Sequence, residues 1–187
     1  VRDDKYWLPL LGLYHGNRLE EFAQLSRSDV KQEDGIYYLD IQDDLQGNRL
    51  KNKQSSRRVP VHPKLLEWGF MEYIEKTAPN PTDRIFPKLK RGGPDNKFGT
   101  SFSKWFTRYR QNISVYERGV DYHSFRHGVV TKLYEANVGD AIVIQLAGHE
   151  GQGTSKKTYL KNLSIELLHE GISKVRWPEV EEIIEAY

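Results

Sequence analysis

The chain has 187 residues and a formal net charge of only +2, so its length suits one domain with a substantial core and its charge identifies no partner. It contains no cysteine, which excludes disulfides, thiol catalysis and cysteine-ligated zinc. No apolar run reaches the ~18 residues of a transmembrane helix, and we expect a cytoplasmic globular domain that does not contact membranes.

The first half of the chain is predicted to combine helices with a small sheet. Residues 6–24 have the apolar spacing of two helical pieces that join at residues 14–17. The apolar face of the first piece comprises Trp7, Leu10, Leu11 and Tyr14. Residues 26–34 are expected to form a connection. Runs rich in β-forming residues predict an antiparallel sheet of about three strands, over residues 35–42, 49–53 and 57–61.

The second half is predicted to be helical apart from its loops. Helices are expected over residues 63–77, 98–111, 124–137, 139–147, 164–172 and 178–186. In the third of these, Val129, Val130, Leu133 and Tyr134 are expected to face inward. We therefore predict a mainly α fold with a small antiparallel β-sheet (the α+β class) in a single domain over residues 1–187.

The middle of the chain is a basic block. Residues 84–132 hold 11 basic and 3 acidic side chains, net +8, whereas residues 1–46 hold 5 basic and 10 acidic side chains, net −5. Aromatic residues are interspersed in the basic block, and its Gly- and Pro-containing segment 88–97 is expected to be a loop. This pattern suits a surface that binds a polyanion. It equally suits a solvated helix with an aromatic core stripe.

The predicted last helix is amphipathic. Its apolar stripe comprises Val180, Ile183, Ile184 and Tyr187, and its acidic residues are Glu179, Glu181, Glu182 and Glu185. The stripe predicts packing either on the chain's own domain or on a neighbouring protomer.

Residues 121–159 carry side chains suited to phosphate chemistry. His123 and Arg126 share one face if this segment is helical. Arginine offers a planar fork of donors for phosphate, and histidine can move a proton near neutral pH. His149 follows Gly148, and Tyr159 lies further along as a candidate covalent nucleophile.

These motifs resemble those of the catalytic domain of tyrosine recombinases, the phage-integrase type. The matching boxes are His123-Ser124-Phe125-Arg126, Gly148-His149 and Tyr159, in this order. Residues 16–21 look like the family's first box, Thr-Gly-x-Arg-x-x-Glu, with His15 in place of threonine. Residues 51–60 are similar to the β-hairpin that carries the family's lysine. The resemblance therefore covers nearly the whole chain.

The resemblance implies a site-specific recombinase or integrase that cleaves and rejoins DNA through a 3′-phosphotyrosyl intermediate. Its catalytic residues would be Arg18, Lys51, His123, Arg126, His149 and Tyr159, with Lys53 as the alternative lysine and Glu21 in support. The tyrosine would attack, the arginines would clamp the phosphate together with His149, His123 would take the tyrosine proton, and the lysine would protonate the leaving oxygen. No cofactor or metal is required. From spacing alone, a surface arginine paired with Glu21 or another neighbour is the better interpretation of Arg18.

Double-stranded DNA is the expected partner. Candidate DNA-binding residues are Arg57, Arg58, Lys88, Lys90, Arg91, Lys97, Lys104 and Arg108. The resemblance implies a homo-oligomer on DNA, a tetramer in the synaptic complex, with a monomer as the alternative for the isolated domain. It also implies that the chain is the C-terminal part of a longer bacterial or phage-derived integrase, without the N-terminal DNA-clamping domain.

Other functions stay open at this stage. A type IB topoisomerase-like DNA strand transferase shares the arginine, lysine and tyrosine chemistry, and a non-catalytic DNA-binding module or a structural helical domain fits the composition. His123, His127 and His149 invite a zinc site, but no carboxylate is spaced to complete it.

Overall fold

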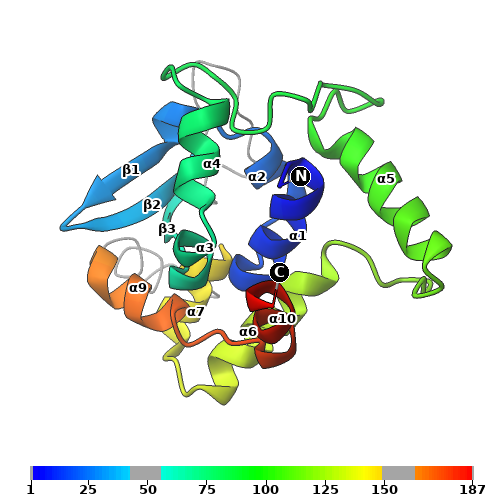
Figure 1. The fold of residues 1–187 in the computed structure, drawn as a ribbon. Helices are drawn as coiled ribbons and strands as arrows, with labels where there is room; N and C mark the ends of the chain where they lie inside the picture. The colour runs from blue at the N-terminus through cyan, green and yellow to red at the C-terminus, as the bar shows by residue number, and fades with distance from the viewer. Residues whose placement is uncertain (1, 43–55, 149–162, 187) are drawn as a thin grey trace.

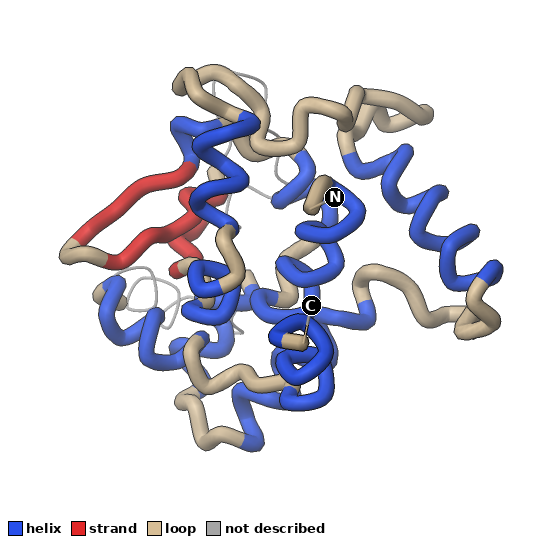
Figure 2. Tube along the Cα trace, in the orientation of Figure 1, coloured by secondary structure: helices blue, strands red, loops and turns tan. Residues whose placement is uncertain are grey.

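The computed structural model describes residues 2–42, 56–148 and 163–186 of the chain (Figure 1). These residues form a mainly helical fold with one small antiparallel sheet at its edge (Figure 2), which confirms the predicted fold class. None of the helices in these ranges is long and apolar enough to span a membrane.

Helix α1 (Asp4–His15) lies at the centre of the fold, where α2 (Leu19–Ala23) and α6 (Ser124–Glu135) pack on it. The Asp3 side chain caps α1 by accepting a 3.0 Å hydrogen bond from the Lys5 amide. The helix ends at Gly16 in the left-handed conformation, φ +68°. The apolar face predicted for this helix is buried throughout.

The sheet has the strand order β1 (Val30–Glu33), β2 (Ile36–Ile41), β3 (Arg57–Pro60), and both pairs are antiparallel. The prediction of a connection over residues 26–34 is therefore wrong, because this segment holds the 3₁₀-helix η1 (Arg27–Asp29) and β1. The polar side chains of β1 after Val30 are exposed at the sheet edge, so the strand has no apolar alternation to reveal it. The predicted strand over residues 49–53 lies outside the described residues.

The single helix predicted over residues 63–77 is two helices, α3 (Pro63–Glu67) and α4 (Phe70–Thr77). The break falls at Gly69, whose φ of +89° no α-helix contains. The bend lets Trp68 and Phe70, on either side of it, both reach the core.

The remaining helices are α5 (Gly99–Asn112), α7 (Asp140–Ala147), α9 (Ile165–Ile172) and α10 (Pro178–Glu185). Helix α5 extends along one side of the molecule, away from the sheet (Figure 1). In α6, Val129 and Leu133 face the core as predicted, but Tyr134 is 49% exposed. Tyr134 follows the inward Leu133 by one residue, about 100° further round the helix, which turns it outward.

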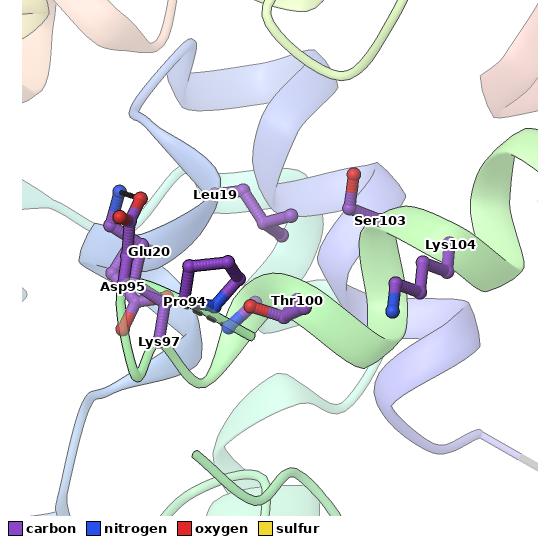
Figure 3. Close-up of a pocket in the computed structure, with 9 residues that line it drawn as sticks. Leu19, Glu20, Pro94, Asp95, Lys97, Thr100, Ser103 and Lys104 are labelled. Carbon is purple, nitrogen blue, oxygen red and sulfur yellow. Dashed lines mark hydrogen bonds and ion pairs between the residues drawn. The ribbon is translucent and has the colours of Figure 1, made fainter. Parts of the chain in front are cut away.

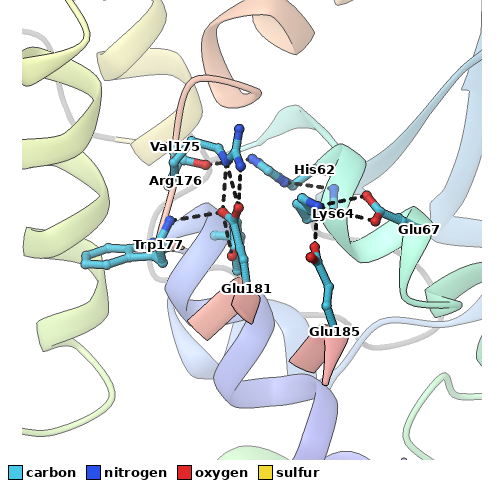
Figure 4. A network of polar contacts seen from close by, with 9 residues as sticks. His62, Lys64, Glu67, Val175, Arg176, Trp177, Glu181 and Glu185 are labelled. Carbon is cyan, nitrogen blue, oxygen red and sulfur yellow. Dashed lines mark hydrogen bonds and ion pairs between the residues drawn. The ribbon is translucent and has the colours of Figure 1, made fainter. Parts of the chain in front are cut away.

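Helix α10 packs on its own domain. The Trp177 indole donates a 2.9 Å hydrogen bond to the Leu13 carbonyl, and the Tyr14 hydroxyl donates a 3.2 Å bond to Glu181. Arg176 and the Trp177 amide also donate to the Glu181 carboxylate (Figure 4). The predicted acidic face is wrong at Glu181, which is buried, and the predicted stripe is wrong at Ile183, which is 61% exposed. The inward face is shifted because Arg176 and Tyr14 satisfy the buried carboxylate.

Candidate active site

Arg18 stands at the N-terminus of α2, where Glu21 holds it. The Arg18 Nη1 donates a 2.9 Å hydrogen bond to Glu21 Oε1, and the Arg18 amide donates a 3.0 Å bond to Glu21 Oε2. The pairing read as an alternative from the sequence is therefore present. Because 29% of the Arg18 side chain is still exposed, the pair orients the guanidinium without enclosing it.

Arg126 is buried on α6 and reaches the loop before Arg18. Its Nη1 donates a 3.3 Å hydrogen bond to the Gly16 carbonyl. Burial, and next the positive charge of Arg18 and then that of Arg57, lower the pKa of Arg126 to about 10. Arg126 is still charged at neutral pH, so arginines from two predicted boxes form one electropositive cluster. Such a cluster suits an anion.

His123 immediately precedes α6, beside the arginine cluster. Its amide donates a 2.7 Å hydrogen bond to Asp121 Oδ1, which fixes the turn into the helix. Burial, followed by the positive charge of Arg126, lowers the pKa of the His123 imidazole below its usual value. The side chain is therefore mostly neutral at pH 7 and able to accept a proton.

Glu21 is the carboxylate around which the arginines gather. Burial by itself would raise its pKa, but the charges and hydrogen bonds of Arg57, and then of Arg18, hold the pKa below its ordinary value. Glu21 therefore stays ionised at neutral pH. One carboxylate facing Arg18, Arg57 and Arg126 leaves an excess of positive charge.

Arg57 lies inside the protein, with only 3% of its side chain exposed. It bonds Glu21 from β3, with 2.8 Å between Nη2 and Oε2. This position argues against the surface contact to DNA that we predicted for Arg57. The sequence misleads here because Arg57 and Arg58 alternate across the strand, and only Arg58 reaches the outer side.

The remaining predicted catalytic residues, Lys51, Lys53, His149 and Tyr159, lie outside the described residues. The structure does place Gly148, the residue before His149. Gly148 ends α7 with φ +65°, and a Cβ built there would lie 2.6 Å from Arg57 Cζ. The glycine of the predicted third box is thus needed both for its backbone conformation and for the close approach of Arg57.

The other predicted DNA-binding residues lie on the sheet, on the loop after α4 and on α5. Arg58 pairs with Glu33 at 2.8 Å, and Lys88 pairs with Asp3 at 3.2 Å. The side chains of Lys88, Lys90, Lys97, Lys104 and Arg108 are exposed, and Arg91 is half-buried. Lys97 and Lys104 line a hollow of about 400 Å³ between α2 and α5 (Figure 3).

Glu20 is a residue that the sequence did not single out for this role. Its carboxylate accepts hydrogen bonds of 2.9 Å and 2.7 Å from the amides of Phe98 and Gly99 at the start of α5. It therefore joins α5 to α2, the helix that begins at Arg18. No local signal reveals this cap, because the partners are far apart in the chain.

Across residues 2–42, 56–148 and 163–186, no three His, Asp or Glu side chains are grouped to hold a metal ion. His123 and His127 lie together, with ring centroids 5.5 Å apart. The third histidine of the zinc alternative, His149, is outside these ranges.

The chain matches the model of the Phage integrase family over residues 4–164, and it belongs to that family. No curated protein matches the chain in sequence. The fold is similar to that of the integrase from mycobacterium phage Brujita, with a TM-score of 0.60 and 18% identity over 98% of this chain and 58% of that chain.

Two structures of the XerH site-specific recombinase are also similar. The pre-cleavage complex with its difH substrate gives a TM-score of 0.55 and 19% identity, over 87% of this chain and 43% of that chain. The post-cleavage complex with palindromic difH gives a TM-score of 0.57 and 21% identity, over 92% of this chain and 46% of that chain. The chain thus spans between 43% and 58% of the length of the solved proteins it matches. The family and the fold agree with the resemblance drawn from the motifs.

Proposed function

We propose that this chain is the catalytic domain of a site-specific DNA recombinase that cleaves and rejoins DNA through a 3′-phosphotyrosyl intermediate. The observation that carries the proposal is that Arg18 and Arg126 lie in one cluster of positive charge. They come from boxes that are far apart in sequence, yet Arg126 bonds the carbonyl of Gly16, in the loop that leads to Arg18. His123, whose pKa is lowered by partial burial and next by the positive charge of Arg126, lies beside them.

In the proposed reaction the Tyr159 oxygen attacks the scissile phosphorus while His123 takes the phenolic proton. A bond forms between tyrosine and the 3′-phosphate, and the bond to the 5′-oxygen breaks. Lys51, or alternatively Lys53, gives that oxygen its proton. Attack by another strand's 5′-hydroxyl reverses these steps and joins DNA without an external energy source.

The arginines stabilise the charge that develops on the non-bridging oxygens. Arg18 and Arg126 approach from different elements, and each offers a fork of donors, with His149 as a further donor. Because the guanidinium groups are held by Glu21 and the Gly16 carbonyl before the substrate arrives, little reorganisation is needed at the moment of reaction.

We propose double-stranded DNA as the partner, bound mainly through its phosphates. The exposed lysines on the loop after α4 and on α5 supply the positive charge, and Lys97 and Lys104 line a hollow together with residues of α2. The two XerH structures are of a site-specific recombinase bound to its difH substrate, which supports this choice. We further propose assembly into a homo-oligomer on DNA and action in the cytoplasm.

Trapping the covalent intermediate tests the proposal. The chain is incubated with a pool of nicked duplexes randomised around the nick, so that the short cleaved strand diffuses away and the adduct accumulates. We expect an adduct that survives denaturing electrophoresis and is absent with Tyr159→Phe. Absence of any wild-type adduct would contradict the proposal. Relaxation of supercoiled DNA without joining of two duplexes would favour the topoisomerase-like alternative.

A further inference from the structure

Arg57 connects parts of the site that are separated in sequence. We propose that Arg57 is a positioning residue: it fixes the start of α2, with Arg18, relative to the end of α7, from which the chain continues to His149. The catalytic consequence rests on the proposed function. The link itself is a property of the fold and is tested separately below.

The first half of the link is the contact with Glu21. Arg57 Nη2 and Nη1 donate to the two carboxylate oxygens of Glu21 at 2.8 Å and 3.3 Å. Glu21 in turn accepts from Arg18 Nη1 at 2.9 Å. A displacement of Arg57 would therefore move the acceptor that orients Arg18.

The second half of the link is the contact with α7. Arg57 Nε donates a 3.2 Å hydrogen bond to the Leu146 carbonyl, in the last turn of that helix. The guanidinium also lies against Gly148, where any Cβ would collide with it. One planar group thus contacts two elements at once.

Lysine could not replace these contacts. An ammonium carries the same charge but has no planar fork, so it cannot address both Glu21 oxygens and the Leu146 carbonyl from one position. Buried ion pairs are a weak source of stability compared with apolar packing. The burial of Arg57 beside the catalytic arginines is therefore better explained by the geometry it imposes than by its contribution to stability.

The direct test is Arg57→Lys, which keeps the charge and removes the fork. The matched control is Arg176→Lys, because Arg176 makes a comparable fork to the buried Glu181 at the tail. On a substrate recovered from the nicked pool, we expect Arg57→Lys to lower the cleavage rate at saturating DNA by about 10- to 100-fold. DNA affinity should change less than about twofold, and Arg176→Lys should cleave at the wild-type rate.

A double-mutant cycle separates positioning from general damage. If Arg57 acts through Arg18, adding Arg57→Lys to an Arg18→Lys variant should lower the cleavage rate by less than about threefold more. If the rate loss of the double variant equals the product of the losses in the two single variants, the inference is overturned. If Arg57→Lys does not fold, Glu21→Gln serves as the second variant, with the same coupling to Arg18 expected.

Amide hydrogen exchange tests the link without any cleavage. Arg57→Lys should speed exchange in α2 and in residues 145–148, and leave α4 as in the wild type, whereas Arg176→Lys should leave both site segments unchanged. Uniform or absent changes in Arg57→Lys would overturn the link. If the wild type forms no adduct but exchange changes as expected, the proposed function fails and the positioning link stands.

Discussion

Arg126 Nη1 donates a 3.3 Å hydrogen bond to the carbonyl of Gly16, and a Cβ built on Gly16 would lie 3.1 Å from the Arg126 Cα. The loop before Arg18 and the helix that carries Arg126 are therefore in direct backbone contact. Glycine is required at position 16 for two reasons: the close approach to α6 and the φ of +68°.

Gly16→Ala should separate these two parts of the site. The new methyl group would also meet the Val129 Cβ at 3.0 Å, and both neighbours belong to α6. The control is Gly35→Ala, since Gly35 also has a positive φ, +80°, but nothing within 4 Å of a built Cβ. We expect Gly35→Ala to cost about 1–2 kcal/mol from the backbone alone and Gly16→Ala about 1–3 kcal/mol more. Urea unfolding measures both, and equal costs would contradict the contact.

Substitutions of the arginine clamp should act on cleavage. Arg18→Ala or Arg126→Ala should each slow single-turnover cleavage by more than two orders of magnitude, about 3–4 kcal/mol in activation free energy. Lysine at either position should not restore the rate, because it lacks the fork. The two substitutions should differ in their effect on the stability of the protein. Because Arg126 is buried, Arg126→Ala should also lower the free energy of unfolding. Normal cleavage by both lysine variants would refute the bidentate clamp.

The sequence predicted the family and the helices better than it predicted the contacts between residues of the candidate site. Periodicity located α1, α6 and α7, because their buried faces repeat with the helix. The hydrogen-bond partners of Arg18 and Arg126 could not be predicted in the same way. The carbonyl of Gly16 and the fork of Arg57 are brought to the site by the tertiary fold, and no local pattern encodes them.

Buried charge was the main source of error. Arg57 and Glu181 were both assigned to exposed faces because charged residues are rarely buried. Each is buried because a partner of opposite charge comes with it: Glu21 for Arg57, and Arg176 for Glu181. Strand β1 was missed for a related reason. Its pairing with β2 depends on backbone hydrogen bonds, and the pattern of its polar side chains does not indicate a strand.

Two buried histidines should make the fold sensitive to acid. Burial lowers the pKa of His15 to about 4, and burial together with the nearby His15 lowers that of His62 to about 3. The unfolded chain binds more protons than the folded one between these values and the ordinary histidine pKa of 6.5, so stability falls as pH falls through this window.

Urea unfolding between pH 7 and pH 4 measures this effect. We expect a loss of up to about 1.4 kcal/mol per pH unit for each histidine. His62→Gln should reduce the slope, because one of the two protonations is removed. Glu181, whose pKa is lowered to about 2 mainly by Arg176, contributes stability that is lost only as pH falls below the ordinary glutamate range towards 2. A flat profile from pH 7 to pH 5 would contradict the role of the histidines.

Trp177 should anchor the C-terminal helix to its own domain. Its indole donates to the Leu13 carbonyl and lies against Gly128, where a built Cβ would be 3.2 Å from the ring, and the Lys132 ammonium lies 5.3 Å from the ring centroid. Trp177 therefore joins α10 to α1 and α6. Trp177→Ala should lower the free energy of unfolding by about 2–4 kcal/mol, since it removes a large packed side chain.

Ile183→Ala provides the matched control on the same helix. Ile183 is 61% exposed, so its truncation should change stability by less than about 0.5 kcal/mol. Unfolding is measured at protein concentrations spanning about two orders of magnitude, because a helix exchanged between protomers would make stability concentration-dependent. With α10 packed in cis, the Trp177 effect should be the same at every concentration. If Trp177→Ala changed the stability of only the concentrated protein, the helix would be docked on a neighbouring protomer.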